Sequence, residues 1–203
     1  MNNEYNIDSF DYIISDTHFL HNNIVKYSMR PGYDSRGYGN HNFNKHNELM
    51  LENWLSVVTD KDSILHLGDV AMGKKEEFRD FAQQLTGNKF MLLGNHDGWG
   101  TDFYGELGFT VIDPFYIHRD GWDILFSHYP KQNLQKREAN VHGHLHINPC
   151  DHLTRRHKNV SVEVMAYSPQ PFREIVKDVV YNSNNNSAAN FRQSYMPKIG
   201  KRG

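Results

Sequence analysis

The stretch Phe90-Met91-Leu92-Leu93-Gly94-Asn95-His96-Asp97 joins an apolar run to four residues that suit metal binding and catalysis. An apolar run that ends in glycine is typical of a buried strand followed by a tight turn, because glycine tolerates close approach and unusual backbone angles. Similar apolar runs precede Asp16 and His18, Gly68-Asp69, and His128. We therefore expect four buried strands that each deliver polar side chains just past their carboxyl ends.

The four expected strands cover residues 10–14, 63–67, 90–93 and 124–126. In open α/β sheets, binding sites form beyond the carboxyl ends of the strands. Strands that merely end in polar turns, as most strands do, would explain one or two such termini. They would not explain metal-ligand chemistry at all four, so the pattern indicates a site at one edge of the fold.

Five short blocks carry this chemistry in order: Asp16-Thr17-His18, Gly68-Asp69, Gly94-Asn95-His96-Asp97, His128 and Gly143-His144-Leu145-His146. They offer carboxylates, an amide oxygen and imidazoles, a set that can hold two divalent cations and leave one histidine free for proton transfer. Residues 144 and 146 alternate, so an extended backbone would turn both of their rings to the same side.

These blocks resemble the motifs of the calcineurin-like metallophosphoesterase superfamily, from about residue 12 to about residue 171. The segment from His18 to Ile24 and the later Arg30-Pro31 are similar to its compact bacterial and phage members, in which a glycine is common where Leu20 stands. The resemblance implies an α/β protein with a single domain, built as a four-layer metallophosphoesterase-type β-sandwich flanked by helices.

The resemblance also implies two cation sites that share one carboxylate. The first would be formed by Asp16, His18 and His146. The second would be formed by Asn95, His128 and His144. Asp69 would bridge both cations, and a shared carboxylate can hold two cations close while offsetting part of their repulsion. Ligands of this kind without thiolate suit manganese, iron or zinc; the resemblance makes manganese the first choice, with iron, zinc or nickel as alternatives.

His96 is the residue we expect to act as general acid, because it adjoins a ligand without being needed in either cation shell. It would protonate the leaving oxygen while a hydroxide held between the cations attacks phosphorus. Asp97 is expected to orient the His96 ring, although it could instead only cap the following turn. His21 and Arg30 belong to the first loop after Asp16, and we expect them to contact substrate.

The chain has 203 residues, a formal net charge of -2 and a single cysteine, so it has no intrachain disulfide framework. The start lacks the pattern of a secretory signal and no apolar run has membrane-spanning length, so we expect a cytoplasmic protein without a membrane partner. We expect a catalytic domain over residues 1–181 and a flexible tail over 182–203, rich in Asn and Ser and then basic.

The rest of the expected secondary structure follows from hydrophobic periodicity. Helices are expected at residues 44–58, 74–85, near 103–107, and at 169–180. Further strands are expected near residues 109–112, 122–126, 139–141 and 160–165. Strands and helices that alternate in this way indicate a layered α/β domain.

Three classes of function fit the sequence. The first is a two-metal hydrolase acting on a phosphodiester or phosphomonoester of a small, nucleotide-like substrate. The second is a metal-dependent nuclease acting on DNA or RNA, for which the net charge gives no global attraction, although residues 131–137 and 155–158 form local basic clusters. The third is a non-catalytic interaction module, the least favoured because every expected ligand is present. The pattern does not predict the oligomeric state.

Overall fold

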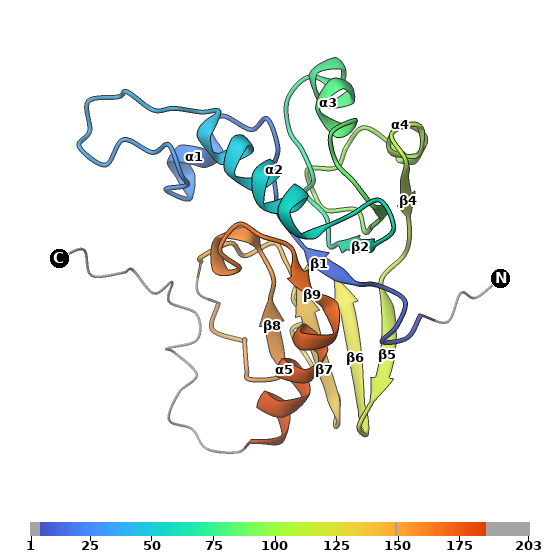
Figure 1. Ribbon diagram of the computed structural model, residues 1–203. Coiled ribbons are helices and arrows are strands. Elements are labelled where there is room, and N and C mark those ends of the chain that lie inside the picture. Colours follow the sequence, from blue (N-terminus) through green and yellow to red (C-terminus); the bar gives the residue numbers. More distant parts are fainter. Residues whose placement is uncertain (1–4, 149, 186–203) are drawn as a thin grey trace.

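The computed structural model describes residues 5–148 and 150–185. Within these ranges the chain forms two β-sheets flanked by helices, as predicted (Figure 1). One sheet has the strand order β4-β3-β2-β1-β9 and the other has the order β5-β6-β7-β8. Across the described ranges, no helix combines the length and the apolar character that crossing a membrane requires.

The first sheet contains the three strands predicted before Asp16, Asp69 and Asn95. Its parallel strands are β1 (Tyr12–Ile14), β2 (Ser63–His66), β3 (Asn88–Met91) and β4 (Phe109–Val111). The short strand β9 (Gln170–Pro171) pairs with β1 in the antiparallel direction. Because β1, β2 and β3 are parallel and adjacent, the polar residues that follow them meet at one edge of the sheet.

The second sheet contains β5 (Phe115–Arg119), β6 (Trp122–Ser127), β7 (Glu138–His142) and β8 (His157–Asn159). Strands β5 and β6 form an antiparallel hairpin, whereas β6, β7 and β8 are parallel. The strand expected at residues 160–165 is wrong: β8 lies just before it, and the segment instead contains the 3₁₀ helix η1 (Val162–Val164). There the backbone turns after Ser161, because the amide of Val162 donates to the carbonyl of Ser15.

Helices α2 (Lys45–Val57), α3 (Lys75–Ala82) and α4 (Thr101–Glu106) pack on the outer face of the first sheet. Alternate strand residues, among them Ile14, Ile64 and Met91, turn toward this face and contact the apolar stripes of the helices. A short helix, α1 (Ile24–Tyr27), lies beyond the first ligand loop. The last helix, α5 (Phe172–Asn184), runs past the expected end at residue 180, and residues 186–203 of the expected tail lie outside the described residues.

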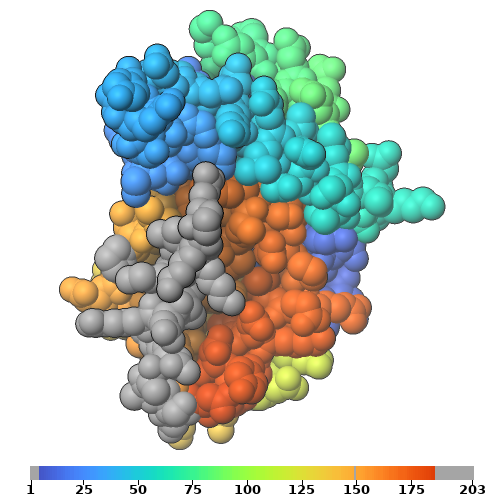
Figure 2. All heavy atoms as spheres, turned by 60° about the vertical axis from the view of Figure 1, so that its left-hand side comes forward, coloured from blue at the N-terminus to red at the C-terminus, as the bar shows by residue number. Residues whose placement is uncertain are grey.

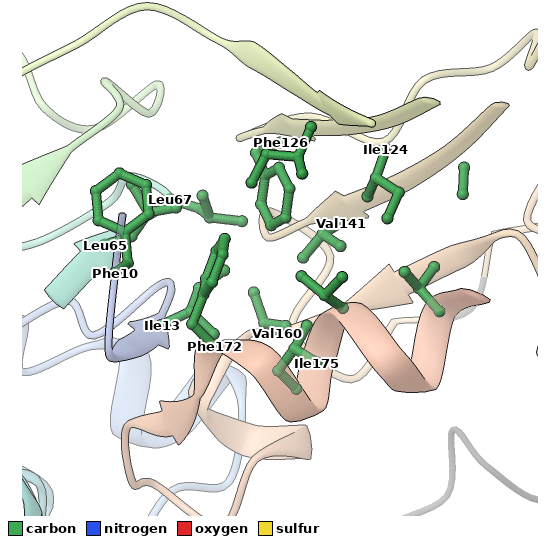
Figure 3. Close-up of a cluster of buried hydrophobic side chains, with 14 of the residues drawn as sticks. Phe10, Ile13, Leu65, Leu67, Ile124, Phe126, Val141, Val160, Phe172 and Ile175 are labelled. Atoms are coloured by element: carbon green, nitrogen blue, oxygen red, sulfur yellow. The ribbon is translucent and has the colours of Figure 1, made fainter. Parts of the chain in front are cut away.

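The opposite face of the first sheet meets the second sheet and α5 in one apolar core (Figure 3). Ile13 and Leu65 approach it from the first sheet, Phe126 and Val141 from the second, and Phe172 from α5. Burying such side chains contributes about 1.5–3 kcal/mol each. A bridge between Ser15 and Ser161 joins the two sheets next to the edge where β1 ends. The core therefore brings the carboxyl ends of β1, β2, β6 and β7 together.

Candidate metal centre

The loops that follow the strands carry five predicted ligands in a left-handed backbone conformation. Their φ angles lie between 46° and 68°, at Asp16, His18, Asp69, His144 and His146. Such a conformation costs about 1–3 kcal/mol at a residue other than glycine, so it persists only where surrounding contacts enforce it. The expectation that residues 144–146 are extended is therefore wrong, since β7 ends at His142 and the amide of Leu145 donates to the carbonyl of Gly143.

Two glycines allow the ligand loops to approach one another closely. Gly68 has a φ of 99°, and a Cβ there would lie 2.6 Å from the backbone nitrogen of Gly94. A Cβ on Gly94 would in turn overlap the Asp69 carboxylate. Gly68 is therefore required for both the turn and the close approach, and Gly94 for the close approach, as the sequence predicted.

One group of predicted ligands, which we call the first cluster, consists of Asp16, His18 and His146. One ligand atom from each lies within 4.8 Å of the others, and the His18 and His146 rings stack with centroids 5.1 Å apart. Asp16 and His18 are fully buried. Neither ring nitrogen of His18 has a hydrogen-bond partner among the described residues. A buried, unpartnered imidazole beside a buried carboxylate suits a cation.

Glu163, which the sequence did not single out, supports the first cluster from behind. Its Oε1 lies 2.9 Å from Nδ1 of His146 and accepts a hydrogen bond of 2.9 Å from Nε of Arg30. Burial alone would raise the pKa of Glu163, but the charge of Arg30 and the His146 hydrogen bond lower it to about 2. A carboxylate on the far nitrogen of a ligand histidine fixes the ring orientation and its tautomer.

Arg30 is an internal residue of this site, and the prediction that it contacts substrate is wrong. It is 1% exposed, and its remaining nitrogens donate to the backbone carbonyls of Thr17 (2.6 Å) and Asp16 (2.7 Å). The guanidinium therefore ties the left-handed turn at Asp16 to Glu163. Its five donors in a planar fork suit this task, which lysine could not perform.

The Asp16 carboxylate is also held by the second sheet. Ser161 Oγ donates to its Oδ2 at 2.9 Å, and the His144 amide donates to both of its oxygens at 2.9 and 3.0 Å. Burial raises the pKa of Asp16, although His146 and His128 act in the opposite direction. These contacts fix the position of the Asp16 carboxylate within the first cluster.

The second cluster consists of Asp69, His128 and His144, again with one ligand atom each within 4.8 Å. Asn95 completes it, because its Oδ1 lies 3.1 Å from Nε2 of His128 and 3.0 Å from Nδ1 of His144. Nδ1 of His128 lies 2.8 Å from the carbonyl of Leu67, which leaves Nε2 to face the cluster. The structure thus brings together the residues that the resemblance assigned to the second cation.

Asp69 lies between the two clusters. Its Oδ2 is 3.4 Å from Nε2 of His18 in the first cluster and 3.5 Å from Nε2 of His128 in the second. Its Oδ1 accepts a hydrogen bond of 2.8 Å from the His96 amide. Burial opposes ionisation here, but the His18 contact, the charge of His128 and the His96 amide hold the pKa of Asp69 well below its usual range.

His96 and His21 lie at the open side of the clusters. The His96 ring centroid is 5.2 Å from that of His18 and 6.5 Å from that of His21. His96 is exposed, and within the described chain its ring accepts and donates no hydrogen bond. His21 is half-buried, and burial lowers its pKa. Both rings thus lie beside His18 of the first cluster, with centroids 5.2 Å and 5.5 Å from its own.

Asp97 has a different task from the predicted one. Its carboxylate accepts hydrogen bonds from the backbone amides of Asp69 (2.6 Å), Gly94 (2.8 Å) and Val70 (3.0 Å), and from the Tyr104 hydroxyl (3.1 Å). The prediction that it orients His96 is therefore wrong, because these donors occupy the carboxylate. Asp97 instead joins the loop after β2 to the loop after β3, and so fixes Asp69 relative to Asn95.

The two basic clusters are largely engaged in contacts within the chain. Lys131 Nζ lies 2.6 Å from Glu138 Oε1, and Lys158 Nζ lies 3.1 Å from Asp178 Oδ2. Arg156 donates to the carbonyl of Gln135. These three cations are paired with groups of β7, of α5 and of the loop before β7, so they present less free charge to an anionic partner than the sequence suggested.

The donor chemistry of both clusters fits a pair of divalent cations. Buried carboxylates, imidazoles and one amide oxygen converge from loops of both sheets. Among the described residues, Nδ1 of the buried His18 has no hydrogen-bond partner and its Nε2 lies 3.4 Å from Asp69 Oδ2 without forming a hydrogen bond. No thiolate belongs to either cluster. Such nitrogen and oxygen donors favour transition metals over calcium.

Comparison with known proteins agrees with this geometry. The family model of the calcineurin-like phosphoesterases matches residues 12–193. An uncharacterized protein of Methanocaldococcus jannaschii is 34% identical over an alignment of 181 residues that covers 82% of this chain and 89% of that protein. A crystal structure of a protein of unknown function from Aquifex aeolicus is similar with a TM-score of 0.57 and 29% identity, covering 82% of this chain and 97% of that one.

A more distant structure, a nuclease called MPE from Pseudomonas putida, has a TM-score of 0.36 and 18% identity over 66% of this chain and 60% of that one. The family model spans most of the chain and includes all five sequence blocks. The chain therefore belongs to the calcineurin-like phosphoesterase family.

Proposed function

We propose that this protein is a dinuclear-metal phosphoesterase that hydrolyses a phosphodiester or phosphomonoester of a small, nucleotide-like substrate. The observation that carries the proposal is the position of Asp69, whose Oδ2 lies 3.4 Å from a histidine of the first cluster and 3.5 Å from one of the second. One carboxylate between two sets of donors is the arrangement needed to share two cations. We further propose that the protein acts in the cytoplasm.

In this proposal Asp16, His18 and His146 hold one cation, Asn95, His128 and His144 hold the other, and Asp69 belongs to both. The cations, manganese as first choice and iron, zinc or nickel as alternatives, would supply Lewis-acid polarisation of the phosphoryl group and activation of water at neutral pH. The buried surroundings of Asp16 and His18 exclude bulk water from the inner side of the site.

His96 is proposed as the general acid. Its amide donates to Asp69 Oδ1, so its backbone position is fixed relative to both clusters while its ring remains exposed. An imidazolium at this position can give its proton to the leaving oxygen of the ester. His21, whose ring lies 6.5 Å from that of His96, is proposed to contact the substrate.

A nuclease acting on DNA or RNA is a weaker reading. Nucleases bind the phosphate backbone with free cationic side chains, and here Lys131, Arg156 and Lys158 contact groups within the chain. A non-catalytic module is weaker still, because every proposed ligand lies in its cluster.

The test is an assay of manganese-loaded protein against phosphomonoesters, phosphodiesters, cyclic nucleotides and single-stranded oligonucleotides. We expect turnover of at least one small ester, and Asp69→Asn should abolish it because the shared carboxylate loses its charge. Asp123→Asn is the matched control, since Asp123 is an exposed residue of β6 that pairs with His118 of β5. Equal activity in Asp69→Asn and the wild type would refute the assignment, and turnover of oligonucleotides alone would favour the nuclease.

A further inference from the structure

Tyr129 is an exposed aromatic residue at the edge of the second cluster. It follows His128 directly, and 51% of its surface is exposed. Its ring centroid lies 4.5 Å from that of His144 and 5.0 Å from that of His128. The ring therefore lies beside two proposed cation ligands, while about half of the residue's surface is open to solvent.

The backbone around Tyr129 is held firmly although its side chain is exposed. Ser127 Oγ donates to the Tyr129 carbonyl at 2.7 Å, and the Lys131 amide donates to Oδ1 of Asn140 at 2.8 Å. Asn140 is fully buried, and its Nδ2 donates to Ser127 Oγ and to the carbonyls of Leu125 and Val141. A buried amide with all of these bonds made is rigid, so the turn holds the ring in place.

The hydroxyl of Tyr129 takes no part in this support. Among the described residues it has no hydrogen-bond partner, whereas the hydroxyls of Tyr104 and Tyr116 donate to Asp97 and Glu138. The ring is thus positioned by its backbone and by the two histidines. A phenylalanine could occupy the same place.

The surroundings of Tyr129 indicate which part of a substrate would lie there. Lys131, the next cation along the chain, has its ammonium 2.6 Å from Glu138 Oε1 and 3.2 Å from the Tyr116 hydroxyl. Its positive charge is therefore already paired within the chain. This edge therefore suits a neutral, planar group rather than a second phosphate.

We propose that Tyr129 is a stacking platform for the nucleobase of a nucleoside phosphoester whose phosphate is held at the two clusters. This inference rests on the proposed function and narrows its substrate class. A planar base offers the π-face that an exposed ring can stack on without reading its identity. The platform accordingly selects nucleosides over other alcohols, with little preference among the bases.

The experiment compares adenosine 5′-monophosphate with ribose 5-phosphate, which differ in the base. Binding of each to manganese-loaded protein is measured by calorimetry, and turnover is followed with the same pair and with their methyl phosphodiesters. Wild type should bind the adenosine compound about tenfold more tightly or better, the range that stacking one base supplies. Tyr129→Ala should reduce this ratio to about twofold or less, whereas Tyr129→Phe should retain it.

Tyr181→Ala is the matched control, because Tyr181 is an exposed tyrosine on α5, and it should keep the wild-type ratio. Equal affinities of wild type for the two compounds, or binding of neither, would overturn the platform. So would equal losses for both compounds in Tyr129→Ala, because the ring would then only support His144. Loss of the affinity ratio in Tyr129→Phe would overturn stacking as the cause, because discrimination would then depend on the hydroxyl and not on the ring. Base-dependent binding without turnover of any ester would uphold the platform and reject the proposed hydrolysis.

Discussion

The first and second clusters use similar side chains in very different surroundings. Asp16 and His18 are buried, and Arg30, Glu163 and Ser161 surround them with hydrogen bonds. In the second cluster His144 is half-exposed, Asn95 is exposed, and the ring of Tyr129 lies at the edge. In Figure 2 the blue atoms of residues around 25–45 form the upper left of the molecule, beside the cyan atoms that follow them in the chain. Asp69 and His128 of the second cluster are also buried, so the two clusters differ mainly at their outer side chains. If the proposed function holds, the enclosed cluster would retain its cation and the exposed edge of the second would meet the substrate.

The largest effect on activity is expected from His96, on the exposed side of the two clusters. His96→Ala should lower kcat by about 100-fold to 10,000-fold, because the leaving oxygen loses its proton donor. Metal content should stay the same, since His96 belongs to neither cluster. Steady-state kinetics and elemental analysis of the same preparation measure both.

The matched control for His96 is His118→Ala, which removes an exposed histidine of β5 that pairs with Asp123. It should behave as the wild type. A His96→Ala protein with unchanged kcat would show that proton transfer does not come from the open side. One that has lost metal would place His96 among the ligands.

The next effect tests the enclosed side. Glu163→Gln should weaken cation binding at the first cluster by about 10-fold to 100-fold, because a neutral amide orients His146 less firmly. Unfolding should also become easier by about 3 kcal/mol, since Arg30 is left as a buried charge without its partner. Manganese titration followed by calorimetry and urea unfolding of the metal-free protein measure the two effects.

Glu138→Gln is a control that separates the effect on cation affinity from the effect on stability. Glu138 is also buried and pairs with Lys131, but it lies at the start of β7, away from both clusters. It should lose some stability and keep its affinity for both cations. If Glu163→Gln binds two cations as tightly as the wild type, the enclosed network serves the fold alone.

The smallest expected effect is on the pH dependence of stability, and it arises from His66, which contacts Thr17 in the loop after β1. His66 is buried, Gly68 N donates to its Nδ1, and its Nε2 lies 2.9 Å from Thr17 Oγ1. Burial lowers the pKa of His66 to about 3 from an ordinary value of 6.5. Below pH 6.5, His66 is therefore protonated in the unfolded chain but stays neutral in the folded chain. Because the unfolded state binds this extra proton, His66 lowers the free energy of unfolding progressively as pH falls from 6.5 toward 3.

Between pH 7.5 and 5.5, His66 should account for a loss of about 1 kcal/mol in the free energy of unfolding. His66→Gln should remove this part of the loss, as measured by urea unfolding of metal-free protein at both pH values. An identical pH dependence in the variant and the wild type would show that His66 carries its proton in the folded state.

The sequence predicted well the strands and which side chains would gather past their ends, because both depend on local patterns. Apolar runs ending in glycine or aspartate identified β1, β2 and β3, and the ligand types that follow them needed no knowledge of distant contacts. The hairpin of β5 and β6 carried a usable signal that was missed: Asp120-Gly121 is a typical two-residue turn, with φ angles of 50° and 78°.

The supporting contacts could not be predicted in this way. Arg30 and Glu163 are 133 positions apart, and neither residue type is distinctive in its local sequence. The left-handed turns at His144 and His146 depend on a hydrogen bond to Asp16 from the other sheet. Asp97 was assigned to its neighbour in sequence, whereas two of its four hydrogen-bond donors lie in the loop after β2 and one lies on α4. In each case the position of the side chain depends on a contact with residues far away in the sequence.

The hydrogen bond from the His144 amide to Asp16 spans 128 positions of the chain. The first cluster draws Asp16 and His18 from one sheet and His146 from the other, so it exists only after both sheets have come together. A cation would therefore bind at this cluster only late in folding. Once bound, it would stabilise the packing of one sheet against the other. Release of metal from this protein would then report the opening of its two halves, before any strand has lost its own hydrogen bonds.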